Sequence, residues 1–388
     1  MKIVDWFRPG IKVKRWVMLG AMGILFIIFG VLEFVNRRFY SMYYISFYVF
    51  LITSGVFVLY VSITQGMRSI IALINKGYLN VSLDSRKLEN LIYEKRLLVK
   101  WPKIVAIGGG TGLSTMLRGL KYYTSNITAI VTVADDGGGS GDLREDLGML
   151  PPGDIRNCIL SLADTEPLME ELLQYRFKDG RLKNQSFGNL FLAAMDGISS
   201  NFEEAVHKMS SVLAVTGKVM PVTLDNIILK AKLKNGTIVE GESNIPIEAI
   251  KQNSSIEKVF IEPKNARALK EAVEAILEAD AIILGPGSLY TSVIPNLLVK
   301  DIADAVNKTQ AVKLYVSNIM TQRGETDGFG VEDHIRSIFK HVGNNVIDYV
   351  VINVGKIDDE LEGKYKEEAS HLVSVDENEL KKLNVSII

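Results

Sequence analysis

Residues 103–122 read KIVAIGGGTGLSTMLRGLKY, in which an apolar run meets a glycine cluster and a helical pattern follows. Short apolar runs bounded by turn residues are typical of buried parallel strands, so residues 104–107 predict a strand. The glycines at 108–112 predict a tight turn, and the residues after them a helix. In a strand–turn–helix arrangement of this kind, the free backbone N–H groups and the positive end of the helix dipole face a bound anion. The stretch therefore predicts an α/β fold with a phosphate site.

Within that turn, Gly109, Gly110, Thr111 and Gly112 are expected to contact a phosphate, and Ser114 to add a hydroxyl donor. The spacing does not match the dinucleotide pattern G-x-G-x-x-G, because no glycine stands at its last position. An NAD-dependent oxidoreductase is therefore disfavoured. A turn that serves only the close packing of helix on sheet remains the structural alternative.

The next predicted strand, 127–134, ends in Asp135 and Asp136, about twenty residues beyond the turn. Rossmann-type domains place there a carboxylate that accepts a hydrogen bond from a ribose. An ordinary solvated strand end is the alternative. The turn and the two carboxylates together favour a nucleotide ligand.

The remainder of residues 102–388 continues this alternation of short apolar runs and helical periods. Further strands are predicted at 281–284, 312–316 and 346–354, and helices at 266–278 and 332–342. Residues 227–240 depart from it, because an Asn-Gly turn at 235–236 joins two apolar runs into a hairpin. The predicted fold is a Rossmann-like, doubly wound, mostly parallel sheet with a small antiparallel insertion.

Four of the predicted strands end in loops rich in glycine, hydroxyl, amide or acidic residues. Because parallel strands end at the same edge of a sheet, these loops predict one pocket. Arg144 would clamp an anion, whereas Asn189 could equally be a helix N-cap. The further residues expected to contact the ligand are Ser140, Arg144, Asp154, Asn157, Asn189, Gly285, Gly287, Ser288, Asn318, Thr321, Glu325 and Thr326.

Two apolar stretches precede this domain, at residues 16–35 and 43–64. Each reaches the roughly 20 residues that a membrane-spanning helix needs, which favours a transmembrane hairpin over two buried core helices. Basic residues lie before the first stretch and after the second, so the positive-inside rule places both ends of the hairpin in the cytoplasm. Arg37 and Arg38, in the turn between the stretches, are a minor signal for the opposite orientation. The expected organisation is a hairpin at 1–65, an amphipathic helical connector at 66–101 and the α/β domain at 102–388. We therefore expect a multi-pass protein of the cell membrane whose C-terminal domain lies in the cytoplasm.

Composition excludes several other classes of function. The net charge of -1 argues against a nucleic-acid partner, and the single cysteine, Cys158, forbids an intramolecular disulfide. No histidine or cysteine spacing fits a zinc site, and Cys158 is expected to be buried, while the helical His334 and His341 are expected at the surface. No resident cofactor is expected, although Mg²⁺ held by carboxylates stays open.

Six motifs, in this order, resemble the gluconeogenesis factor (YvcK-like) family, which is related to the CofD-like 2-phospho-L-lactate transferases. They are GGGTGLSTMLRGLK, ITAIVTVADDGGGSGDLR, PPGDIRNCILSLAD, SFGNLFLAAM, ILGPGSLYTSVIPNLLV and SNIMTQRGETDGF. The resemblance covers residue 103 to the end. Gly139 and Asp142, in and directly after the second glycine loop (residues 137–141), stand where that pattern has serine and arginine, which removes a hydroxyl and reverses a charge beside the expected phosphate contacts. Arg323 stands where the pattern has proline.

The resemblance implies a UDP-sugar ligand, UDP-N-acetylglucosamine, and a role in cell-wall precursor supply and cell shape during growth on gluconeogenic carbon sources. The leading hypothesis is a non-catalytic sensor that regulates an enzyme of amino-sugar or cell-wall precursor synthesis, with a homodimer left open. The alternative is a transferase that moves a phospholactyl group from a nucleotide-activated donor to a deazaflavin acceptor, with Asp135 or Asp136 holding magnesium.

Overall fold

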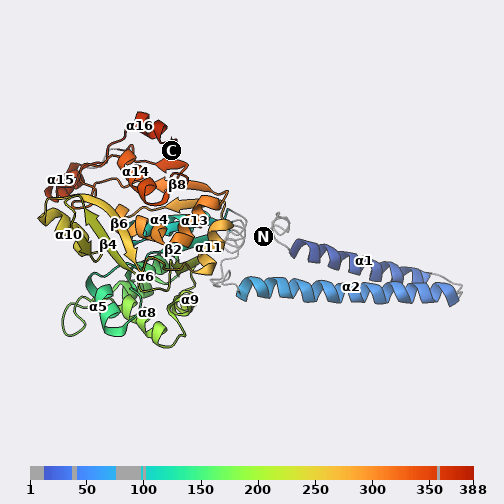
Figure 1. The fold of residues 1–388 in the computed structure, drawn as a ribbon. Helices are drawn as coiled ribbons and strands as arrows, with labels where there is room; N and C mark the ends of the chain where they lie inside the picture. The colour runs from blue at the N-terminus through green and yellow to red at the C-terminus, as the bar shows by residue number, and fades with distance from the viewer. Residues whose placement is uncertain (1–12, 37–41, 76–97, 99–101, 356–358) are drawn as a thin grey trace. The chain divides into compact units, whose positions relative to one another are not determined.

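The structure, a computed structural model, describes residues 13–36, 42–75, 98, 102–355 and 359–388. The chain forms two compact units, Met1–Lys100 and Trp101–Ile388 (Figure 1).

The first unit consists of two long helices, α1 (Val13–Asn36) and α2 (Met42–Asn75). Within them, Trp16–Phe34 and Tyr43–Gln65 are long and apolar enough to cross a membrane, and few of their residues are buried. Helix α2 runs past the expected end of the hairpin to Asn75, so the first residues of the expected connector belong to the same helix. The rest of the connector, 76–97 and 99–101, lies outside the described residues.

Small residues bring α1 and α2 into close contact. A Cβ atom built on Gly23 would lie 2.9 Å from the Gly55 carbonyl oxygen, and one built on Gly55 would lie 2.9 Å from the Gly23 oxygen. Nearby, the Ser62 hydroxyl donates to the Trp16 carbonyl oxygen over 2.5 Å. Backbones that approach this closely are typical of helix pairs in membranes, where small residues and interhelical hydrogen bonds replace hydrophobic burial.

The second unit is built on a seven-stranded sheet whose strands are all parallel, in the order β10-β9-β8-β7-β1-β2-β3. The strands are β1 (Ile104–Gly108), β2 (Ile127–Val131), β3 (Lys218–Pro221), β7 (Ala281–Leu284), β8 (Val312–Val316), β9 (Tyr349–Val351) and β10 (Ser386–Ile387). Strands β1 and β2 are buried along most of their length and β7 at every second residue, which explains why these strands consist almost entirely of apolar residues.

Helices connect the strands and cover the sheet, as expected for a doubly wound fold (Figure 1). One group packs around β1, β2 and β3 and comprises α4 (Gly110–Leu120), α6 (Gly153–Leu162) and α9 (Phe202–Val212). A second comprises α11 (Lys270–Leu277), the π-helical turn η2 (Leu289–Val293), α12 (Ile294–Leu298) and α13 (Lys300–Lys308). The others are α5 (Gly138–Leu147), α7 (Pro167–Gln174), α8 (Phe187–Gly197), α10 (Asn244–Lys251), α14 (Val331–Val342), α15 (Asp359–Glu367) and α16 (Glu377–Lys382).

The antiparallel insertion is a three-stranded sheet, in the order β5-β4-β6. The predicted hairpin is confirmed as β4 (Ile228–Leu233) and β5 (Ile238–Glu240), with Gly236 at a φ of 92° in the turn. Strand β6 (Ile256–Glu262), which the sequence reading missed, pairs with the other side of β4. The predicted fold is therefore confirmed, with one more strand in the insertion and two more, β3 and β10, at the edges of the main sheet.

Several predicted elements are longer than those observed, for identifiable reasons. The run 127–134 pairs only to Val131, because its partner β1 ends at Gly108 and turns away. Helix α11 begins at Lys270 instead of 266, since carboxylates capture two of the preceding backbone N–H groups: Arg267 donates to Asp225 and Ala268 to Asp301. Of the predicted strand 346–354, only Tyr349–Val351 pairs with β8.

Candidate functional site

The order of the strands places a crevice between β1 and β7. The chain proceeds from β1 to β2 and β3 on one side, and from β7 to β8, β9 and β10 on the other. In open α/β sheets, ligands bind at the carboxyl ends of the strands at such a switch point. The two loops that flank it are residues 108–112 after β1 and 285–288 after β7. We call the space between them the switch-point crevice.

The two glycine loops touch across this crevice. A Cβ atom on Gly112 would lie 3.0 Å from the Pro286 carbonyl oxygen, and one on Gly287 would lie 3.0 Å from the Gly109 carbonyl oxygen. Gly110 has a φ of 71°, which disfavours any residue with a side chain. Helix α4 begins at Gly110 with no side-chain cap from Gly109; the Gly110 N–H donates to the Asp154 carboxylate, and the first-turn N–H groups after it have no acceptor within their own helix.

The two hydroxyls expected beside these amides differ in their surroundings. Thr111 is exposed, in the first turn of α4. Ser114 is buried, and its hydroxyl donates to the Thr111 carbonyl oxygen over 2.9 Å. The structure thus leaves Thr111 open to a ligand and ties Ser114 to its own helix.

Asp135 and Asp154 come together beside the first glycine loop. A Cβ on Gly153 would lie 3.1 Å from Asp135 Oδ2, and one on Gly109 would lie 2.5 Å from Asp154 Oδ2. Burial, and then the neighbouring Asp135 charge, raise the pKa of Asp154 to about 6, against the opposing effect of the Gly110 N–H and Arg156. Burial also raises the pKa of Asp135. Two predicted ligand residues from separate loops therefore form one carboxyl pair.

Asp136 points elsewhere and fastens the antiparallel insertion. Its carboxylate oxygens accept from the Glu242 and Ser243 backbone N–H groups, each over 2.9 Å, and from the Ser243 hydroxyl over 2.7 Å. These bonds hold the turn between β5 and α10 against the end of β2. Asp136 thereby positions Glu242.

Glu242 is the principal site residue that the sequence reading missed. Burial first, and then the charges of Asp135, Asp154 and Glu325, raise its pKa to about 8. Burial likewise raises the pKa of Glu325 to about 7, although the Tyr290 N–H and the Thr291 hydroxyl donate to it. Three carboxyl groups from separate segments of the chain thus lie close enough to Glu242 to raise its pKa. Glu242 follows an antiparallel strand, so the pattern of parallel strand ends does not predict it. Its position directly after Gly241 is the one signal in the sequence that could have indicated it.

The raised pKa of Glu242 predicts a pH-dependent effect of Glu242→Gln on stability. Because its folded pKa of about 8 exceeds its ordinary value, wild-type stability falls as pH rises from about 4.5 to 8. The variant should be more stable than wild type by about 1–3 kcal/mol at pH 8, and the difference should vanish near pH 5. Urea unfolding at both pH values measures it. Glu145→Gln, on the exposed side of α5, is the control, and a gain that does not change with pH would contradict the assignment.

Arg156 and Asn189 form a buried pair next to the carboxyl cluster. Arg156 Nε donates to Asn189 Oδ1 over 3.1 Å, and both residues are buried. Burial first, and then Arg176, lower the pKa of Arg156 to about 10, so it remains charged at neutral pH. Ser186, which accepts from the Asn189 N–H, caps α8, so the N-cap interpretation of Asn189 was wrong. The neighbouring Asn157 is half-buried on α6.

In the second glycine loop (residues 137–141) and the helix that follows it, side chains expected to contact a ligand are bonded to the protein itself. Arg144 Nη2 donates to Asn226 Oδ1 and to the Ile227 carbonyl oxygen, each over 2.5 Å, and this engages the guanidinium that was expected to clamp an anion. Ser140 is buried beside Gly153.

Gly139 and Asp142, the two residues of this region that differ from the family pattern, both lie next to Gln185. A Cβ on Gly139 would lie 2.7 Å from Gln185 Oε1, and Gln185 Nε2 donates to Asp142 over 3.0 Å. Gly139 leaves the room that this side chain occupies, and Asp142 binds it.

In the loop after β8, some polar side chains form hydrogen bonds and others have buried oxygens without a hydrogen-bond partner. Gln322 Nε2 donates to Ser288 over 2.8 Å, which joins this loop to the one after β7. The Thr326 hydroxyl accepts from the Gln322 N–H, and the Thr321 hydroxyl accepts from the His371 N–H. Buried oxygens without a hydrogen-bond partner remain on Asn318, Gln322 and Glu325. Arg323 is exposed.

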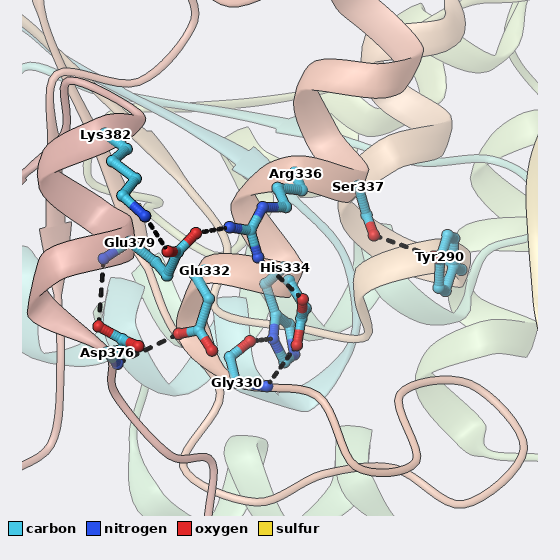
Figure 2. Close-up of polar contacts among 10 residues, drawn as sticks. Tyr290, Gly330, Glu332, His334, Arg336, Ser337, Asp376, Glu379 and Lys382 are labelled. Atoms are coloured by element: carbon cyan, nitrogen blue, oxygen red, sulfur yellow. Dashed lines mark hydrogen bonds and ion pairs between the residues drawn. The ribbon is translucent and has the colours of Figure 1, made fainter.

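The histidines of α14 correct one expectation. His334 is fully buried, its Nδ1 donating to the Gly330 carbonyl oxygen over 2.8 Å (Figure 2), and His341 is half-buried, its Nε2 accepting from the Val259 N–H over 3.0 Å. Burial lowers both pKa values. The His341 bond joins α14 to β6, whereas the His334 bond lies within the N-terminal turn of α14. Cys158 is buried as predicted, and burial raises its pKa.

Comparisons with known proteins agree with this architecture. The chain matches the family described as 2-phospho-L-lactate transferase CofD over residues 104–388. A relative from Clostridium acetobutylicum, provisionally named a gluconeogenesis factor, is 74% identical over 100% of this chain and 86% of its own length. The gluconeogenesis factor of Bacillus subtilis is 48% identical over 288 residues, which are 74% of this chain and 90% of that relative. The first alignment includes α1 and α2, whereas the second has about the length of the α/β unit.

A solved structure supports the fold of that unit. The crystal structure of a UPF0052 family member from Bacillus halodurans has a TM-score of 0.71 and 49% sequence identity to this chain. The match covers 74% of this chain and 91% of that one.

Proposed function

Because the chain belongs to the 2-phospho-L-lactate transferase CofD family, and within it to the gluconeogenesis factors, we propose that it binds a UDP-sugar at the switch-point crevice. The ligand proposed is UDP-N-acetylglucosamine. The diphosphate would lie on the backbone N–H groups between Gly109 and Gly112. This proposal treats the protein as a ligand-binding regulator.

The observation that carries the proposal is a cluster of four carboxyl groups, of which Asp154 lies against the first glycine loop. After burial, the charges of Asp135, Asp154 and Glu325 raise the pKa of Glu242, and the charge of Asp135 raises the pKa of Asp154. Carboxylates accept hydrogen bonds from hydroxyls, and a hexose offers several. Amides for a diphosphate and carboxyl groups for a sugar suit the two halves of a nucleotide-sugar.

Ligand-dependent unfolding tests this proposal. A ligand that binds only the folded chain stabilises it by about 2.7 kcal/mol at 100 times its Kd. UDP-N-acetylglucosamine at such a concentration should therefore raise the unfolding midpoint of the α/β unit by several degrees, and N-acetylglucosamine alone should not. An unchanged midpoint at millimolar UDP-N-acetylglucosamine would count against the proposal.

A second candidate function is favoured by the description of the matching family and by the Asp135–Asp154 pair. Mg²⁺ is commonly held by one or two carboxylates together with substrate phosphates. These two residues fit that donor set, although no group of three or more histidine, cysteine or acidic residues able to hold a metal occurs in the described part of the chain. A phospholactyl transferase would use Mg²⁺ there to offset phosphate charge. Transfer of phospholactate to a deazaflavin alcohol would establish it.

The regulatory proposal includes the membrane and a protein partner. Helices α1 and α2 would anchor the chain as a hairpin, with the α/β unit in the cytoplasm. The sugar-bound unit would then regulate an enzyme of amino-sugar or cell-wall precursor synthesis, and so cell shape on gluconeogenic carbon sources. Association as a homodimer is compatible with this arrangement.

A further inference from the structure

Arg156 is a buried cation whose terminal groups are not used by the protein. The residue is 7% exposed, and its Nε donates to Asn189 Oδ1 over 3.1 Å. Within the part of the chain that the structure describes, the two Nη groups of Arg156 form no hydrogen bond or ion pair. A guanidinium presents its N–H donors in a planar fork that matches an oxyanion. Because buried charges are normally paired, this fork is open to an anion from outside the protein.

The surroundings of the Arg156 guanidinium are mostly positive. Arg156 lies in the first turn of α6, and its partner Asn189 lies in the first turn of α8. The amino-terminal end of a helix carries a partial positive charge. After burial, the charge of Arg176 lowers the pKa of Arg156, whereas Asp154 opposes this effect without forming an ion pair. An anion bound between the two helix starts would offset these positive charges.

A basic hairpin lies beside the start of α8. We give this name to residues 176–184, in which the Phe177 N–H donates to the Gln185 carbonyl oxygen over 2.9 Å. At its base, Arg176 forms a bridge with Ser186, the residue that caps α8. Four basic residues against one acidic residue leave an excess of three positive charges on its exposed surface, which attracts anions. These charged residues are Arg176, Lys178, Asp179, Arg181 and Lys183.

Gly188 leaves the room that the Arg156 side chain occupies. A Cβ atom there would lie 2.8 Å from Arg156 Cδ and 2.5 Å from the Leu173 carbonyl oxygen. The aliphatic stem of Arg156 therefore packs on the second residue of α8, and Asn189 fixes the guanidinium through Nε. An arginine that is held at its stem and at Nε presents its Nη groups at a defined place, as recognition of a phosphate requires.

This place is separate from the switch-point crevice. Asp154 accepts from the Gly110 N–H and lies against the first glycine loop. Arg156 follows two residues later on α6, which is about 200° around a helix of 3.6 residues per turn. The two side chains therefore leave α6 on nearly opposite sides, and that of Arg156 reaches α8.

From these observations we infer that Arg156 is the centre of a second anion site, which binds a phosphate group between the starts of α6 and α8. The Nη groups of Arg156 donate to two phosphate oxygens, and the basic hairpin attracts the anion. A phosphate group carries about 1.5–2 negative charges at neutral pH, so the positive surroundings favour it over a carboxylate, which carries one. The site goes beyond the UDP-sugar proposed for the switch-point crevice and takes a further ligand, either free phosphate or a phosphate ester.

Thermal unfolding of the full chain in detergent, followed against phosphate concentration, tests this inference. Inorganic phosphate should raise the unfolding midpoint of wild type more than potassium chloride at the same ionic strength. Arg156→Met keeps an apolar stem and removes the charge and the donors, so the apparent Kd for phosphate should rise at least about 10-fold. Arg267→Met removes an arginine whose side chain is 81% exposed and should leave that Kd unchanged.

A second variant keeps the test valid if Arg156→Met does not fold. Arg156→Lys retains the positive charge but loses the planar fork, so it should still weaken phosphate binding several-fold. Glycerol 3-phosphate, titrated in parallel, distinguishes the two sources of the phosphate group: tighter binding of the ester identifies a phosphorylated ligand, and tighter binding of inorganic phosphate identifies the free ion.

Gly112→Val separates this site from the one proposed in the crevice. That variant disturbs the first glycine loop and should keep the phosphate response of wild type. A response that is lost in Gly112→Val and kept in Arg156→Met would overturn the inference, because phosphate would then bind at the first glycine loop. Equal effects of phosphate and potassium chloride on wild type would overturn it too. Absence of UDP-N-acetylglucosamine binding, with the Arg156-dependent phosphate response intact, would remove the proposed function alone.

Discussion

Gly112→Val is expected to lower the affinity for UDP-N-acetylglucosamine at least about 100-fold, since small displacements of positioning groups have effects of that size. The glycine faces backbone atoms and not a flexible side chain: its Cβ would lie 3.0 Å from the Pro286 oxygen and 3.4 Å from the Gly287 nitrogen. The larger side chain must push the two loops apart and displace the N–H groups that would hold the diphosphate. Titration of the purified variant measures the loss.

Gly119→Ala is the matched control for this variant. Gly119 lies on the same helix, α4, but a Cβ there has no other atom within 4 Å. Alanine should leave ligand affinity unchanged and stabilise the domain by about 0.5–1 kcal/mol, because it restricts the unfolded chain and favours the helix. Equal affinities of Gly112→Val and wild type would exclude the crevice as the phosphate site.

Removal of residues 1–101 is expected to transfer the protein from the membrane pellet to the soluble fraction almost completely. The two helices expose large apolar side chains along their length, for example Leu25 at 63%, Phe50 at 68% and Phe57 at 67%. Such surfaces are stable in lipid and unfavourable in water. The remaining α/β unit has its own core, so it should stay folded.

Carbonate washing and centrifugation measure this distribution, with circular dichroism to confirm that the shortened chain is folded. Leu25→Arg combined with Phe50→Arg in the full chain is a useful control, because charges inside both apolar spans should also prevent insertion. Recovery of the unmodified full chain in the soluble fraction would contradict the membrane anchor.

Much of the fold could be predicted from the sequence because parallel strands carry a strong local signal. The run at 104–107 is apolar because its strand is buried on both faces, whereas those at 281–284 and 312–316 are fully buried only at every second residue; each of the three lies in the main sheet as expected. The ends of elements were less predictable. Strand β2 ends at Val131 because its neighbour β1 turns away there. The end of β2 thus depends on a different segment of the chain, and residues 127–134 alone do not reveal it.

The candidate site was predictable to the extent that it follows parallel strands. The switch-point loops, Asp135 and Asn318 could be named as candidates because parallel strands end at one edge of a sheet. Glu242 was missed because it enters from the antiparallel insertion, and Asp136 positions it through bonds between residues over a hundred positions apart in the chain. Burial of His334 depends on contacts with segments remote in sequence, and a helical pattern does not reveal them.

Isothermal titration of the full chain in detergent with UDP-N-acetylglucosamine tests the central claim most directly. The crevice and its four carboxyl groups predict saturable binding at one site per chain, weakened by Gly112→Val and unaffected by Gly119→Ala. Absence of heat up to millimolar ligand, or binding that Gly112→Val leaves unchanged, would contradict it.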